Sequence, residues 1–121
     1  MSRIAHLENE AVAVRDNIRT STRKLDMVAA LIRGMRAADA LTTLTFCKKR
    51  VAIEVKKALK SAIANAENNN SLDVDSLYVQ EAYVGKGIKM RRFRPQAKGR
   101  AAPIIKMFSR LTIIVAEREL N

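Results

Sequence analysis

Residues 77–117 have the sequence LYVQEAYVGKGIKMRRFRPQAKGRAAPIIKMFSRLTIIVAE, and this stretch decides the fold. Its two ends, residues 77–84 and 111–117, are rich in β-branched and aromatic residues, which predicts a strand at each end. The 25 residues between them, 85–109, are too many for a structureless loop inside a compact domain. We therefore expect both strands to continue outward as a two-stranded ribbon, which we call the arm (residues 85–109). At about 3.3 Å per residue, half the segment in each strand gives a projection of roughly 40 Å.

The arm is strongly cationic. Residues 84–110 contain nine Lys and Arg and no Asp or Glu. An isolated two-stranded ribbon is only marginally stable in water, and like charges at this spacing repel one another. We therefore expect the arm to be mobile in the isolated protein and ordered only against a polyanion. Its bends and its turn are expected at Gly85, Gly87, Pro95, Gly99 and Pro103.

Composition limits the classes of function. The chain has 121 residues, a net charge of +11 and only 4% aromatic residues, so we expect one small domain (residues 11–121) after a flexible segment (residues 1–10). So basic a protein fits nucleic acid or an anionic membrane surface. The membrane is the weaker interpretation, because no basic amphipathic helix accompanies the charge. Neither a signal peptide nor an apolar run long enough to span a membrane is evident, which favours the cytosol.

Catalysis and metal binding lack the necessary residues. Cys47 is the only cysteine, which excludes an intramolecular disulfide and a cysteine-rich metal site. His6 is the only histidine and lies in the polar N-terminal segment, so a Cys-His nucleophile pair is not expected. The acidic residues are dispersed, and the GKG at residues 85–87 lacks the spacing of a phosphate-binding loop. The sequence predicts no enzyme, no cofactor, no metal and no small-molecule substrate.

The rest of the chain predicts one strand and three helices. Residues 11–20 are expected to form a strand, and Ser21 or Thr22 to cap a first helix that Gly34 ends. A short second helix is expected at residues 37–44. Residues 48–68 carry one apolar stripe at helical spacing and predict a third helix. The predicted fold class is α+β, with three helices packed on a small three-stranded antiparallel sheet and a long protruding β-hairpin.

Two kinds of nucleic acid fit the arm. Its arginines can bind phosphates through two hydrogen bonds and stack on bases, which suits RNA, where recognition depends on shape, stacking and backbone contacts. The alternative is a DNA-architectural protein, whose basic β-arm would insert Phe93 or Pro95 into the minor groove. Such proteins generally act as dimers, and no exposed apolar dimer surface is evident in the sequence.

Several segments resemble the bacterial form of the large-subunit ribosomal protein family numbered L twenty-two. They include SAIANAENN (residues 61–69), LDVDSLYVQEAYVGKG (72–87) and RPQAKGRA (94–101), and they stand in the order and spacing of that family. The resemblance covers about residues 11–118. It implies a structural protein of the large ribosomal subunit that binds its ribosomal RNA, supports assembly and lines the nascent-peptide exit tunnel with its hairpin. The implied partners are that RNA, the ribosomal protein numbered L four and the nascent peptide, in a cytoplasmic or organellar ribosome.

The resemblance and the charge pattern together give candidate site residues. The expected RNA-binding residues are Arg23, Lys24, Lys49, Lys56, Lys60, Lys86, Lys89, Arg94, Lys98, Arg100 and Arg110. The resemblance implies that the hairpin tip facing the tunnel consists of Lys89, Met90, Arg91, Arg92, Phe93 and Arg94.

Overall fold

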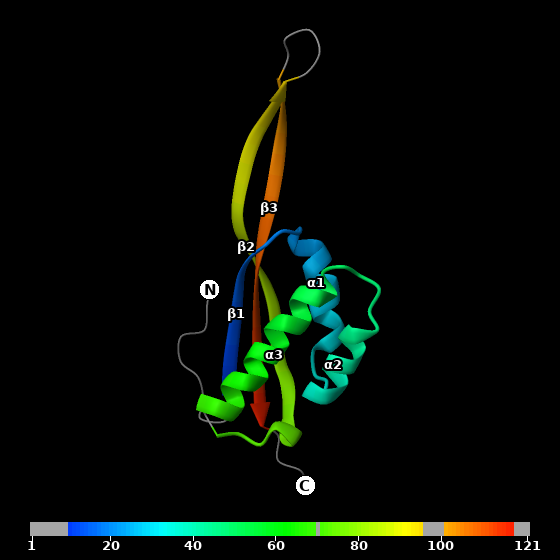
Figure 1. Cartoon of the computed structure of the whole chain (residues 1–121), viewed down its shortest axis with the longest axis vertical. Helices are drawn as coiled ribbons and strands as arrows, with labels where there is room; N and C mark the ends of the chain where they lie inside the picture. Colours follow the sequence, from blue (N-terminus) through cyan, green and yellow to red (C-terminus); the bar gives the residue numbers. More distant parts are fainter. Residues whose placement is uncertain (1–9, 70, 96–100, 118–121) are drawn as a thin grey trace.

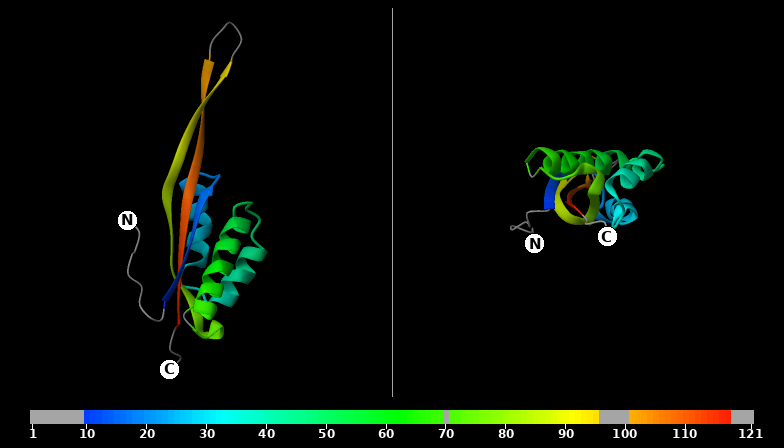
Figure 2. Two further views of the ribbon diagram at one scale, coloured as in Figure 1. Left: turned by 60° about the vertical axis from the view of Figure 1, so that its left-hand side comes forward. Right: turned by 90° about the horizontal axis from the view of Figure 1, so that it is seen from below.

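The computed structural model describes residues 10–69, 71–95 and 101–117. In chain order they form β1 (Glu10–Ile18), α1 (Thr22–Ile32), α2 (Ala37–Thr45), α3 (Ala52–Asn69), a 3-10 turn η1 (Val74–Ser76), β2 (Leu77–Pro95) and β3 (Ala101–Glu117). The strands form one antiparallel sheet in the order β1-β3-β2. The helices cover one face of that sheet (Figure 1, Figure 2). This confirms the predicted α+β class.

The arm exists because the three strands differ in length. β1 ends at Ile18, which pairs with Ser109 of β3. Beyond this point β2 and β3 continue as a two-stranded ribbon, paired out to Pro95 opposite Ala101 (Figure 1). The predicted hairpin is therefore present in the described residues. Gly99, which we expected in the turn, lies outside them.

Pro103 does not mark a bend, contrary to the prediction. It lies inside β3, opposite Phe93 of β2. Each strand of a two-stranded ribbon has one open edge, where the N–H that proline lacks needs no partner in the ladder. The register instead shifts between Lys86 and Lys89, and an extra residue in one strand bends a ribbon. Gly87 lies within this shift, which agrees with its predicted place at a bend.

Helix α1 follows its sequence signals closely. The Ser21 hydroxyl caps it by accepting a hydrogen bond from the backbone N–H of Lys24, at 3.3 Å. One face, consisting of Leu25, Val28, Ala29 and Ile32, is fully buried, and this burial holds the helix on the sheet. Gly34 has a φ of +79°, a conformation that favours glycine and ends the helix as predicted.

Helix α3 begins at Ala52 rather than at the predicted residue 48. The three residues Lys48, Lys49 and Arg50 are all exposed, so no apolar contact fixes a helical turn there. The backbone N–H of Ala52 donates instead to the carbonyl of Lys49, at 3.1 Å, within a turn. The helix starts where the first side chain, that of Ala52, becomes buried.

The predicted boundary of the N-terminal segment is one residue too late. Glu10 is the first residue of β1, where it pairs with Ala116 of β3, and only 1% of it is exposed. The backbone ladder fixes Glu10, although its charge suggested a solvated segment. Residues 1–9 lie outside the described residues.

The core lies between the helices and the sheet, and α3 contributes mainly small side chains to it. Ala58, Ala62 and Ala66 are buried along α3, which lets the helix lie close to β1 and β3. Asn65 of the same helix donates from its side-chain N–H to the carbonyl of Val12 in β1, at 3.0 Å. The predicted apolar stripe is therefore the face that holds α3 on the sheet.

Leu59 tests this packing. It is fully buried on α3, whereas Leu31 on α1 is 49% exposed. We expect Leu59→Ala to lower the free energy of unfolding by about 2–5 kcal/mol because it leaves a cavity. The matched Leu31→Ala should change it by less than about 0.5 kcal/mol. Chemical denaturation of the full chain measures both, and equal losses would contradict this account of the core.

Gly87 tests the base of the arm. A Cβ atom added at Gly87 would lie 2.8 Å from the carbonyl oxygen of Phe108, whereas one added at Gly85 would meet nothing within 4 Å. Because the contact is with backbone, the strands must shift to relieve it. We expect Gly87→Ala to cost about 1–3 kcal/mol of unfolding free energy. Gly85→Ala is the control and should leave stability nearly unchanged, so a Gly85→Ala variant as unstable as Gly87→Ala would exclude the contact as the cause.

Candidate nucleic-acid interface

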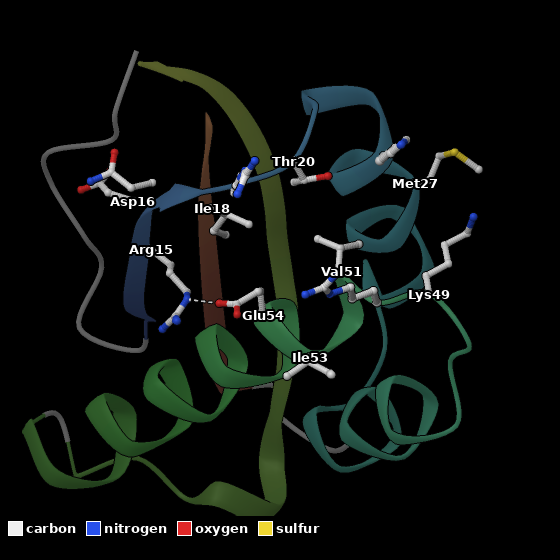
Figure 3. Close-up of a pocket in the computed structure, with 13 residues that line it drawn as sticks. Arg15, Asp16, Ile18, Thr20, Met27, Lys49, Val51, Ile53 and Glu54 are labelled. Carbon is white, nitrogen blue, oxygen red and sulfur yellow. Dashed lines mark hydrogen bonds and ion pairs between the residues drawn. The ribbon is translucent and has the colours of Figure 1, made fainter. Parts of the chain in front are cut away.

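A basic hollow lies where the end of β1, the start of α1 and the start of α3 meet (Figure 3). Its lining includes Ile18 and Val51. Its cations come from three separate parts of the chain and are Arg15, Arg19, Lys24, Lys49 and Arg50. We call this surface the basic hollow.

Both acidic residues of the basic hollow are held by arginines. Arg15 Nε lies 2.7 Å from Glu54 Oε2, which connects β1 to α3 (Figure 3). Asp16 Oδ1 lies 2.6 Å from Nε of Arg110 in β3. Each pair is about half-exposed or less, so each contributes at most about 1 kcal/mol to stability and acts mainly to position side chains.

Four cations of the basic hollow keep their full charge available. Arg19, Lys24, Lys49 and Arg50 make no ion pair within the part of the chain that the structure describes. All four are exposed. A cluster of unneutralised cations around a concavity attracts an anion with several charges, because each further phosphate contact adds to the binding.

The base of the arm shares residues with the basic hollow. The hydroxyl of the buried Ser109 donates to the carbonyl of Thr20, at 2.8 Å. Arg110 is paired with Asp16, as described above. Thr20 and Asp16 both line the basic hollow, so the base of the arm is in direct contact with the residues of the hollow.

The structure brings together only some of the predicted site residues. Lys24 and Lys49 lie in the basic hollow, while Arg23 is exposed beside it on α1. Lys56 is half-buried and Lys60 exposed on α3, and Lys86 is exposed at the base of the arm.

The predicted tip residues lie in the outer part of β2. Residues 89–94 pair with residues 102–107 of β3, so the segment that joins the two strands follows Pro95. Lys98 and Arg100, which we expected to bind RNA, lie outside the described residues.

Sequence reasoning missed three cations of the basic hollow: Arg15, Arg19 and Arg50. Arg50 carried a signal, since it ends the basic run Lys48-Lys49-Arg50. Arg15 and Arg19 carried none, because only the packing of β1 beside α3 brings them near that run. Cys47 is partly buried against the core.

Other chemistry is not indicated in the described ranges. Residues 10–69, 71–95 and 101–117 contain no group of three or more His, Cys, Asp or Glu side chains placed to hold a metal ion. In the same ranges, no helix has both the length and the apolar character that crossing a bilayer requires.

Comparison with known proteins gives one consistent family. Residues 13–116 match the family described as ribosomal protein L22p/L17e. The "Large ribosomal subunit protein uL22" of Granulibacter bethesdensis is 60% identical over 111 residues, which is 92% of this chain and 84% of the relative. The proteins of the same name from Rhodopseudomonas palustris strain HaA2 and Maricaulis maris are 57% and 59% identical over 112 residues. These matches cover 93% of this chain and 88% and 89% of the relatives.

Proposed function

The chain belongs to the ribosomal protein L22p/L17e family, and from this premise we propose that its basic hollow and its arm bind large-subunit ribosomal RNA. The chain is a structural constituent of the large subunit of a bacterial-type, cytoplasmic ribosome, and it is not an enzyme. These statements confirm the predictions from sequence. Its partners are ribosomal RNA and other components of the ribosome.

The observation that carries the proposal is the cluster of cations in the basic hollow that have no ion-pair partner among the described residues. The chain has 23 Lys and Arg against 12 Asp and Glu. In the basic hollow, the two acidic residues are held by Arg15 and Arg110, and within residues 10–69, 71–95 and 101–117 this leaves four cations for a ligand. A chain of phosphates satisfies them at once and releases its own counterions when it binds.

The RNA-binding set that we propose extends from the basic hollow over the body and the arm. In the body it comprises Arg19, Arg23, Lys24, Lys49, Arg50, Lys56 and Lys60. In the arm it comprises Lys86, Lys89, Arg94, Lys98, Arg100 and Arg110. Arg110 holds Asp16 through a single nitrogen, Nε, and its half-exposed guanidinium retains further donors for phosphate.

We further propose that the arm lines the nascent-peptide exit tunnel. A ribbon that projects from the body can enter a channel that is too narrow for the body itself (Figure 1). Residues 89–94 would face the nascent peptide there, beside the ribosomal protein numbered L four, and the arm would support assembly by joining distant RNA segments. The support for this proposal is the family resemblance together with the length of the ribbon beyond β1. Family membership disfavours the DNA-architectural alternative.

A pair of substitutions that removes two positive charges tests the basic hollow. We expect Lys49→Gln with Arg50→Gln to weaken binding to protein-free large-subunit ribosomal RNA and to make the plot of log K against log salt shallower by about 2, one for each lost phosphate contact. Binding titrations at several salt concentrations measure both quantities. Arg33→Gln is the control, because Arg33 lies outside the basic hollow and its charge is paired with Asp26. If Arg33→Gln changed the salt slope as much as each charge lost from the basic hollow does, the position of the charge on the protein would not matter, which would contradict the proposal.

A shortened arm tests the separation of arm and body. Lys89 and Met107 are opposite one another, so an Asn-Gly turn can join them in place of residues 90–106. We expect the free energy of unfolding to change by less than about 1 kcal/mol, because the deleted ribbon has no core of its own, while the affinity for ribosomal RNA falls. Chemical denaturation and RNA titration of the same variant provide the two readings. Loss of the folded body would show that the arm is part of the core.

A further inference from the structure

Phe46 presents an aromatic ring to solvent from a fixed position. It lies at the C-terminal end of α2 and is 79% exposed. The other aromatic residues whose side chains are described, Tyr78, Tyr83 and Phe108, are all partly buried. Leaving a phenylalanine in water forgoes the stabilisation that its burial provides. Single exposed apolar side chains are common on protein surfaces, so the charges that accompany the ring, rather than its exposure alone, indicate a partner.

The backbone around Phe46 holds the ring outward. The N–H of Phe46 donates to the carbonyl of Thr42, at 3.2 Å, and the N–H of Cys47 donates to that of Leu44, at 3.3 Å. The Cys47 side chain packs against the core. The exposure of Phe46 thus follows from the fold of the α2–α3 connection and not from a loose loop.

Three cations follow Phe46 in the sequence, after Cys47. Lys48, Lys49 and Arg50 are exposed, and the sequence has no Asp or Glu between Asp39 and Glu54. Glu54 itself is paired with Arg15. The ring therefore stands beside three positive charges that no nearby carboxylate neutralises in the described part of the chain.

We propose that Phe46 stacks on an unpaired base of large-subunit ribosomal RNA, while Lys48, Lys49 and Arg50 bind the flanking phosphates. This inference rests on the proposed function and assigns an unpaired nucleotide to this part of the RNA-binding surface. Every base has a π-face, so an exposed ring is a platform for any of them. Lys49 and Arg50 also line the basic hollow, and three residues of chain span at most about 11 Å. One RNA segment can therefore touch both the hollow and the ring.

The charges favour a base over a neighbouring protein. The centre of a protein–protein interface is depleted of charged residues, lysine in particular, because they lose their hydration there. Here the aromatic ring is followed within two residues by the first of two lysines and an arginine. A nucleotide satisfies both features at once, since its base is flat and apolar on its faces and its phosphate is anionic.

Titration of protein-free large-subunit ribosomal RNA with full-length variants tests the inference. Phe46→Leu keeps an apolar side chain without a ring, and Phe46→Tyr keeps the ring. We expect Phe46→Leu to bind about tenfold more weakly, with an unchanged salt slope because no charge is lost. Phe46→Tyr should bind within about twofold of the original chain. Leu31→Ala, which removes another exposed apolar side chain, is the matched control and should bind like the original.

The possible outcomes separate the inference from the proposed function. Failure of the original chain to bind this RNA would overturn both. Binding by the original chain with no loss in Phe46→Leu, or with an equal loss in Phe46→Tyr, would overturn the stacking contact alone. Normal RNA binding by Phe46→Leu combined with its loss from assembled subunits would assign the ring to a neighbouring protein and would also overturn it. Thermal unfolding should be the same for all variants, because Phe46 is 79% exposed.

Discussion

Electrostatic repulsion within the ribbon of β2 and β3 is the constraint on which the rest of the structure depends. Past the end of β1, no third strand or helix from the described part of the chain lies beside these strands (Figure 2), and residues 84–110 bring nine cations and no carboxylate. With backbone hydrogen bonds as its main support, such a ribbon is only marginally stable. A polyanion removes the repulsion, so under the proposed function the charges that weaken the isolated arm would be the ones that fix it in a complex with RNA.

The body provides the arm with a rigid base. Ser109 is fully buried and donates to Thr20, and Arg110 holds Asp16. The same stretch of β1 is connected to α3 through Arg15 and Glu54. RNA bound in the basic hollow would therefore contact the residues that orient the arm. Under the proposed function, this arrangement would let the basic hollow and the arm act as a single binding surface.

Local patterns in the sequence predicted most of the fold. The cap at Ser21, the stop at Gly34 and the apolar stripe of α3 depend on residues close together in the chain, and all three are present. The predicted start of α3, at residue 48, was wrong because residues 48–50 are exposed and no packing contact holds them in a helical turn. The basic hollow could not be predicted, because Arg19 and Arg50 are 31 positions apart and meet only through the packing of β1 beside α3. The exposure of Phe46 likewise depends on the backbone conformation of the segment that connects α2 to α3, which local sequence patterns do not specify.

Amide hydrogen exchange in the paired part of the arm tests the central claim most directly. The backbone amides of residues 89–94, 101–102 and 104–107 are compared in the isolated full chain and in the complex with protein-free large-subunit ribosomal RNA. The account predicts rapid exchange in the isolated chain and strong protection in the complex, with the amides of α3 protected in both. Strong protection of the arm before RNA is added, with no further change afterwards, would contradict it.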